Sequence, residues 1–205
     1  MMVSRLHPLP LGTTPLIIKF IGDSVNDYET ALSQGLNSPT YCPICSGICH
    51  LHGCYSRTVL ADERRVLSIQ RVWCMNCKVT HAIIPNFLTP YGRYPTAARE
   101  AVVTDHANGV PLEESGASHG QTVETSKRWI VNFKRNISSM LGAIRSLLSR
   151  QHHYHFDDED SSLHALTGLC RLWLNKQSPG FSLIPGSVFG WANLILSQAA
   201  ERMWL

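Results

Sequence analysis

Two pairs of cysteines constrain this chain more than any other feature of its sequence. They are Cys42-Pro-Ile-Cys45 and Cys74-Met-Asn-Cys77, and 28 residues separate them. Two thiolates that are two residues apart can bind one tetrahedral metal ion from a single turn. The second pair completes the four ligands if the intervening chain folds back as a hairpin. The spacing therefore predicts a metal site formed by Cys42, Cys45, Cys74 and Cys77.

The residues between and after the two pairs favour such a hairpin. The runs 58–60, 66–73 and 79–84 are rich in β-prone residues, and 61–64 has the composition of a turn. Prolines at positions 85, 90 and 95 then end strand formation. Each cysteine pair alone is a weak signal, but two pairs around a β-hairpin are a strong one.

Zinc suits these ligands best, because it favours a closed tetrahedral shell of four sulfurs. A four-cysteine iron site and a redox dithiol are alternatives. Six of the seven cysteines lie between positions 42 and 77, which leaves further choices open. Cys49 can replace Cys45, and Cys54 or His81 can serve as reserve ligands. Cys170 lies on an apolar helical stripe, where a core role is expected.

The segment 96–136 has the spacing of three short helices. Gly109 stops the first, Pro111 suits the first turn of the second, and Thr122 suits the N-terminal cap of the third. A small residue in the second helix lets two helices cross closely, and Gly120 in the turn accepts a positive φ. This layout is typical of a helix-turn-helix.

The third predicted helix, 122–135, has an apolar face and a basic face. Residues 121–150 carry six Lys or Arg against one acidic residue, and residues 54–100 carry seven against three. In a helix-turn-helix, the N-terminal half of this helix meets base edges, while other basic residues contact phosphates. We therefore expect contacts with DNA, although the pattern does not separate DNA from RNA. The predicted DNA-binding residues are Thr122, Glu124, Lys127, Arg128, Lys134, Arg135, Arg57 and Arg71.

The rest of the chain is predicted from its apolar periodicity. Residues 137–150 continue as helix, 151–162 form a polar loop, and further helices begin near 163 and 187. Their apolar residues are expected to form a core or a homodimer contact. These residues are Leu163, Leu166, Trp173, Trp191, Leu194 and Ile195.

The predicted fold is α+β and has four parts. Residues 1–40 receive no function, although a strand near 16–21 and a short helix over 27–36 are expected. A small β zinc ribbon follows at 41–95, then the helix-turn-helix at 96–136 and C-terminal helices at 137–205. No apolar run approaches the roughly 20 residues of a membrane span. A cytoplasmic location is expected, without a membrane partner.

A resemblance to known proteins supports this division. The segments that carry it are Cys42–Cys45, Leu51–Arg57, Val72–Cys77, Thr80–His81 and Pro85–Tyr91. In order and spacing they resemble the N-terminal zinc-binding domain of insertion-sequence transposases. They are closer still to small bacterial zinc-ribbon proteins of unknown function found with mobile elements. The resemblance covers about residues 41–135 and implies a ribbon ahead of a DNA-binding helix-turn-helix.

The expected function is that of a zinc-containing DNA-binding protein, associated with transposition or regulation. The resembling transposases continue into a large nuclease domain, and about 70 residues after position 135 are too few for one. No GxSxG, phosphate-loop or HExxH motif occurs. Cys49 with His50 or His52 could act as nucleophile and base, but they lie among the metal ligands, so catalysis is not expected. Alternatives are a protein-interaction adaptor in a transposition or transcription complex and a truncated, inactive transposase fragment.

Overall fold

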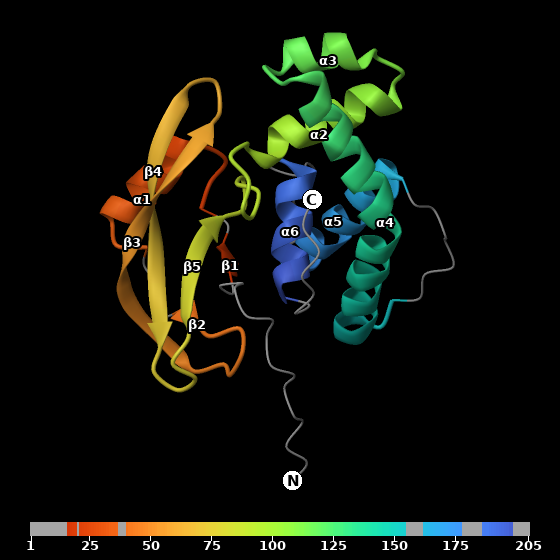
Figure 1. Ribbon diagram of the computed structural model, residues 1–205. Helices are drawn as coiled ribbons and strands as arrows, with labels where there is room; N and C mark the ends of the chain where they lie inside the picture. Colours follow the sequence, from red (N-terminus) through yellow and green to blue (C-terminus); the bar gives the residue numbers. More distant parts are fainter. Residues whose placement is uncertain (1–15, 20, 37–39, 155–161, 178–185, 199–205) are drawn as a thin grey trace.

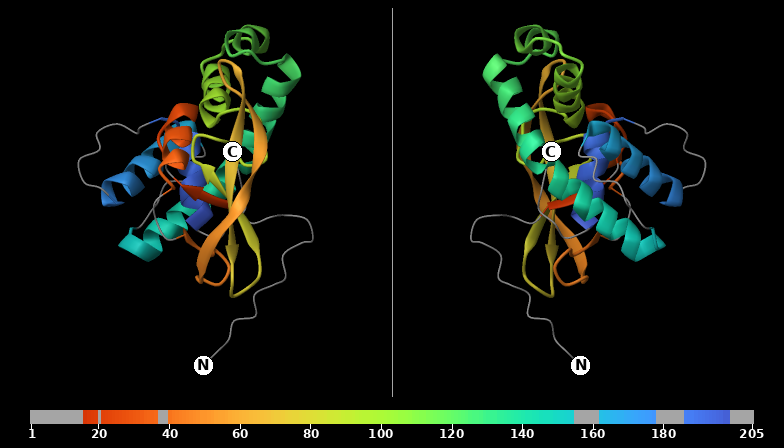
Figure 2. Two further views of the ribbon diagram at one scale, coloured as in Figure 1. Left: turned by 90° about the vertical axis from the view of Figure 1, so that its left-hand side faces the viewer. Right: turned by 90° about the vertical axis from the view of Figure 1, so that its right-hand side faces the viewer.

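The computed structural model describes residues 16–19, 21–36, 40–154, 162–177 and 186–198. Within these residues the chain forms five strands in one sheet and six helices, so the predicted α+β class is confirmed. The sheet and α1 make up one side of the molecule, and the other five helices make up the other side (Figure 1). In Figure 2, the long β3–β4 hairpin lies in front of α4 in the left view and behind it in the right view, and α4 runs obliquely to the hairpin.

The sheet has the order β1-β5-β4-β3-β2. β1 pairs with β5 in parallel, and the other neighbours are antiparallel. The strands are β1 (Leu16–Lys19), β2 (Thr40–Tyr41), β3 (Ile48–Leu60), β4 (Arg64–Cys74) and β5 (Thr80–Pro85). The predicted hairpin is present, but β3 begins ten residues earlier than the run expected at 58–60.

β4 buries one face in its first half and the opposite face in its second half. Leu67 and Ile69 pack with α1 and β5, whereas Val72 and Cys74 pack on the other side with the cysteines. Successive strand residues point to opposite faces, so the change of phase places two small cores on the two sides of the sheet. A register shift between Leu51 and Cys54 of β3 accompanies this change.

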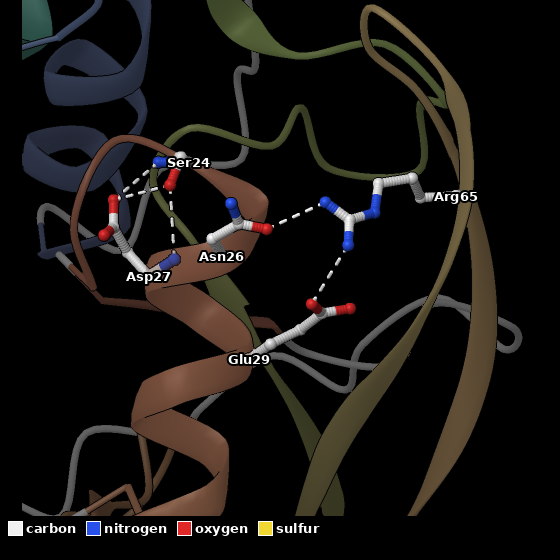
Figure 3. A network of polar contacts seen from close by, with 5 residues as sticks. All are labelled: Ser24, Asn26, Asp27, Glu29 and Arg65. Carbon is white, nitrogen blue, oxygen red and sulfur yellow. Dashed lines mark hydrogen bonds and ion pairs between the residues drawn. The ribbon is translucent and has the colours of Figure 1, made fainter.

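Helix α1 (Val25–Ser33) is fixed to the hairpin by polar contacts (Figure 3). Its capping box joins Ser24 and Asp27, which satisfies backbone N–H groups at the helix start. Arg65 of β4 donates to Asn26 at 2.8 Å and pairs with Glu29 at 3.4 Å. The described residues of the 1–40 segment, which received no predicted function, therefore lie on the sheet side of the molecule.

Three helices follow the sheet: α2 (Thr96–Ala107), α3 (Leu112–Ser118) and α4 (Val123–His152). α3 packs on the start of α4 and on the turn before it: a Cβ at Gly116 would lie 2.9 Å from the Gln121 carbonyl oxygen in the turn and 3.5 Å from Ser126 Oγ of α4. Gly120, in the turn between them, has a φ of +65°. The positive φ of Gly120 was predicted, and for the close approach the sequence offered Ser115 or Gly116. The helical continuation expected over 137–150 is part of α4, one unbroken helix of 30 residues.

The last two helices are α5 (Leu163–Gln177) and α6 (Val188–Gln198). α6 contacts α2, α4, α5 and β1, and it lies between the sheet and the other helices (Figure 1). Of the apolar residues predicted here, five are buried in one shared core and Leu163 packs against it. They therefore form the core of a single chain, while a homodimer contact stays a prediction. No described helix combines the length and apolar character that a membrane crossing needs.

Candidate functional site

The two cysteine pairs lie in turns with the same backbone geometry. In the first, Cys42 N–H donates to the Gly47 carbonyl at 2.8 Å, and the Cys42 carbonyl accepts from Ser46 N–H at 2.9 Å. In the second, Cys74 makes the equivalent bonds with Val79 and Lys78, both at 2.9 Å.

The residue after the second cysteine of each pair has a left-handed backbone conformation. Ser46 has a φ of 57° and Lys78 a φ of 60°. The two turns also face each other closely, since a Cβ at Gly47 would lie 2.5 Å from Asn76 Nδ2. The register pair Cys49–Cys74 places both turns at the same end of the β3–β4 hairpin.

The four predicted ligand sulfurs converge. Cys42 Sγ lies 3.5 Å from Cys77 Sγ, and Cys45 Sγ lies 3.4 Å from Cys74 Sγ. All four sulfurs are within 4.8 Å of one another. A disulfide needs about 2.05 Å, and the cysteines are free. Four sulfurs at about 2.3 Å from one zinc would be about 3.8 Å apart, so this cluster can hold a tetrahedral metal ion.

A second group shares Cys42 with this cluster. Cys49 Sγ and His81 Nε2 lie within 4.8 Å of Cys42 Sγ, and His81 Nε2 is 3.2 Å from that sulfur. His81 is fully buried. The structure thus favours a contact between His81 and one cysteine ligand over a place in the four-sulfur set. Cys54 is exposed and belongs to neither group of ligand atoms.

The surroundings shift the pKa values of the cysteines in opposite directions. The backbone N–H of Cys77 is the main cause that lowers the pKa of Cys74 to about 6. Burial raises the pKa of Cys77 to about 12 and that of Cys49 to about 12. Ile44 N–H also donates to Cys42 Sγ at 3.4 Å. Backbone donors directed at sulfur stabilise the thiolate form in which cysteine binds metals.

The start of α4 exposes the basic residues predicted to contact DNA. Thr122 caps the helix by accepting from Thr125 N–H at 3.2 Å. Ser126, Trp129 and Ile130 are buried, as the amphipathic pattern predicts. The exposed predicted residues of this helix are Glu124, Lys127, Arg128, Lys134 and Arg135. In Figure 1 this part of α4 lies with α3 at one end of the molecule.

The two hairpin residues predicted to contact DNA have different settings. Arg71 is partly exposed on β4 and joins no ion pair in the part of the chain that is described. Arg57 is largely buried and donates to the carbonyl oxygens of Thr89 and Gly92. Its guanidinium holds the 89–92 turn, and its contact with DNA stays a prediction.

A groove of about 960 Å³ lies between the hairpin turn, the start of α1 and the α3–α4 turn. Its wall includes the carboxylates of Asp23, Asp62 and Glu63 beside a single arginine, Arg65. Negative charge disfavours nucleic-acid phosphates there. The basic face of α4 is the better candidate surface for such a ligand.

Arg99 of α2 was not predicted as a site residue, yet its guanidinium lies over an aromatic ring. Its Cζ lies 5.3 Å from the centroid of the Trp129 ring, and Tyr94 packs edge-on against the same ring. In the sequence, Arg99 is a basic residue in the first turns of an amphipathic helix. Nothing in that pattern distinguishes it from an ordinary solvent-exposed arginine.

The fold and the cysteine cluster define an α+β protein with a site that can bind a metal ion. Residues 42–129 are similar to a protein family described as a domain of unknown function (DUF6431). That segment begins at the first cysteine of the cluster and ends at Trp129 in α4, so it includes the cysteine cluster and Lys127 and Arg128 but not Lys134 or Arg135. No curated protein and no solved structure matches the chain.

Proposed function

We propose that this chain is a zinc-containing DNA-binding protein. The observation that carries the metal part is the convergence of four cysteine sulfurs from two equivalent turns. Zinc matches that ligand set because it prefers four thiolates in a closed tetrahedron. In this proposal, Cys42, Cys45, Cys74 and Cys77 hold one structural zinc, and β3, β4 and β5 form the ribbon around it.

The DNA-binding part is carried by the exposed basic start of α4. α3 and α4 act as a helix-turn-helix in this proposal, with the first turns of α4 in the major groove. Lys127 and Arg128 are exposed without an ion-pair partner among the described residues. They can therefore contact guanine or phosphate without first breaking an internal bond. Lys134 and Arg135 lie two turns further on and would contact phosphate.

We include a role with mobile elements or in regulation, because the cysteine segments resemble those of insertion-sequence transposases. A larger transposition complex and a homodimer on two half-sites are partners compatible with this role. Neighbouring reading frames that encode a transposase would support it. A set of unrelated neighbours would favour a general regulator.

A protein-interaction adaptor is the second candidate. Exposed apolar side chains near the cysteine turns favour it: Tyr41 is 59% exposed, Ile48 54% and Met75 50%. Such a group of side chains is typical of a protein-binding surface. An adaptor would bind DNA weakly, with little dependence on the basic face of α4.

A salt-titrated DNA-binding assay on the full zinc-loaded chain tests the main proposal. We expect log K to fall linearly with log salt concentration, because bound phosphates release counterions. Lys127→Ala and Arg128→Ala should each weaken binding and reduce the slope by about one.

Arg150→Ala is the matched control, since Arg150 is exposed at the other end of α4. Binding that is absent, or that Lys127→Ala weakens no more than Arg150→Ala does, would contradict the DNA-binding proposal. A partner protein captured by the chain under those conditions would then favour the adaptor.

A further inference from the structure

Three arginines come together where the hairpin meets the helices. Arg57 comes from β3, Arg99 from α2 and Arg128 from α4, and we call them the arginine cluster. Burial first, and then the positive charges of Arg128 and Arg57, lower the pKa of Arg99 to about 10. Geometry also links them: Arg57 donates to the carbonyl of Gly92, which Arg99 borders, and Arg99 lies over Trp129, the residue after Arg128.

No carboxylate compensates this charge within the described chain. The ion pairs found there join Arg65 to Glu29 and His119 to Asp105, and neither includes a residue of the cluster. Arg57 is held by the carbonyls of Thr89 and Gly92, but carbonyls do not neutralise it. A partly buried positive charge without a counter-charge costs free energy, and such costs concentrate at binding sites.

Polar atoms beside the cluster also lack partners. Arg99 Nε and Thr89 Oγ1 are buried and make no hydrogen bond in the described part of the structure. Thr89 is only 1% exposed. Both side chains border Gly92, where a Cβ would lie 2.9 Å from Arg99 Nη2 and 3.2 Å from Thr89 Cβ. Buried polar groups in proteins are normally hydrogen-bonded, so Arg99 Nε and Thr89 Oγ1 are exceptions among the described residues.

The surroundings hold Arg99 in place. Its guanidinium lies over Trp129, and Tyr94 packs edge-on against the same ring at a centroid distance of 5.2 Å. The Thr89–Gly92 turn closes with a hydrogen bond of 3.1 Å, and Tyr91 within it has a φ of 59° and is 66% exposed. A rigid, stacked guanidinium next to an exposed one on α4 presents the forked donors that suit phosphate oxygens.

We propose that Arg99 and Arg128, with Arg57 behind them, form a binding site for a phosphate group at the hairpin–helix junction. Inorganic phosphate and the phosphates of a nucleic-acid backbone offer the same oxygens to this site. Its assignment to the nucleic-acid backbone rests on the proposed function, in which this phosphate lies beside the bases met by α4. The ribbon and the helices would then contact the same stretch of backbone.

Thermal unfolding in inorganic phosphate, compared with chloride at equal ionic strength, tests the site without DNA. Phosphate should raise the melting temperature of the zinc-loaded chain, because a ligand that binds only the folded state stabilises it. Arg99→Met should lose most of that rise, and Arg150→Met should keep it. Arg128, the site residue on α4, is about 33 Å from Arg150 along that helix, at 1.5 Å per residue.

The same variants in the DNA assay separate the two proposals. Arg99→Met should reduce the salt slope by about one, as one phosphate contact is lost. If DNA binding depends on Lys127 but Arg99→Met behaves as Arg150→Met does, the phosphate site is wrong and the proposed function stands. If phosphate stabilises the chain through Arg99 but DNA does not bind, the site stands and the proposed function is wrong.

A structural role for Arg99 gives a different result. Met keeps most of the apolar stem of Arg99, and it removes a positive charge that no carboxylate of the described residues pairs with. We therefore expect Arg99→Met to melt no lower than the wild type when phosphate and DNA are absent. A clear loss of stability without any loss of phosphate or DNA binding would overturn the proposal and assign Arg99 to packing against Trp129.

Discussion

At the scale of single residues, the cysteine cluster has a close neighbour that lies outside the four-sulfur set. His81 is buried on β5 and places Nε2 3.2 Å from Cys42 Sγ. In the tautomer that carries its proton on Nε2, His81 donates to the sulfur, which stabilises the negative charge of a thiolate and fixes its orientation. Groups of this kind tune a metal site without belonging to its ligands.

We predict that His81→Phe weakens zinc binding by about 10- to 100-fold, the range found for residues that orient metal ligands. The stoichiometry should stay at one zinc per chain, because the four sulfurs remain. Competition with a chromophoric chelator measures the affinity. His50→Phe is the control, as His50 is exposed on β3. Equal affinities for the two variants would remove the role assigned to His81.

At the scale of elements, the crossing of α3 and α4 is set by Gly116. A methyl group there would lie 2.9 Å from the Gln121 carbonyl oxygen, which belongs to the backbone and cannot rotate away. We predict that Gly116→Ala destabilises the chain by ~1–3 kcal/mol, as overpacking does. Equilibrium unfolding in urea measures the change.

Gly142→Ala is the matched control for that variant. Gly142 lies within α4, and a Cβ there would meet nothing within 4 Å. Alanine in a helix interior is better than glycine by ~0.5–1 kcal/mol, so this control should gain stability. If both variants changed the free energy of unfolding in the same direction, the close approach at Gly116 would be contradicted.

Asp105 links α2 to α3 and to the turn after it. Its Oδ2 accepts from Ser115 Oγ and contacts His119 Nε2, both at 2.8 Å. The hydrogen bond from Ser115, and then that from His119, lower the pKa of Asp105 below its ordinary value. A depressed carboxyl pKa stabilises the fold above the unfolded pKa of about 3.9, and this contribution is lost as pH falls through the folded pKa.

We therefore predict that Asp105→Asn lowers the urea midpoint at pH 7 and has a smaller effect at pH 3. Asp62→Asn, at an exposed position in the hairpin turn, is the control and should change neither midpoint. A deficit of equal size at both pH values would show that the carboxylate charge contributes nothing to the α2–α3 contact.

The sequence predicts these elements unequally well, for physical reasons. The cysteine pairs, Gly120 and the Thr122 cap were predicted because their roles depend on neighbouring residues. The first part of β3 was missed, because its polar and glycine-containing run is held as a strand by pairing with β4. The role of Arg57 was also missed, because it depends on the fold bringing the 89–92 turn to its side chain.

At the scale of the whole molecule, β1 joins the sheet to the helices. Ile17 packs against the core around the cysteines, whereas Ile18 belongs to the helical core that contains α6. Glu100 of α2 adds a polar link, because it accepts from Ser187 Oγ at 2.6 Å and from Phe189 N–H at 3.2 Å at the start of α6. The metal end and the basic end therefore belong to one continuous packed structure.

Because the two ends share one packed structure, the rest of the proposed function depends on the proposed metal site. The core around the cysteines is small, and its members include the ligands themselves. A metal ion that joins the two turns would supply much of the stability at this end of the hairpin. If the four sulfurs do not share an ion, the ribbon and the DNA-binding proposal both lose their main support.

X-ray absorption at the zinc edge of the zinc-loaded full-length chain tests this claim most directly. We expect one zinc per chain with four sulfur neighbours at about 2.3 Å. Cys74→Ser should lose a sulfur from that shell, and Cys54→Ser should keep all four. A wild-type shell that contains an imidazole nitrogen, or a chain that retains no zinc, would contradict the four-cysteine site.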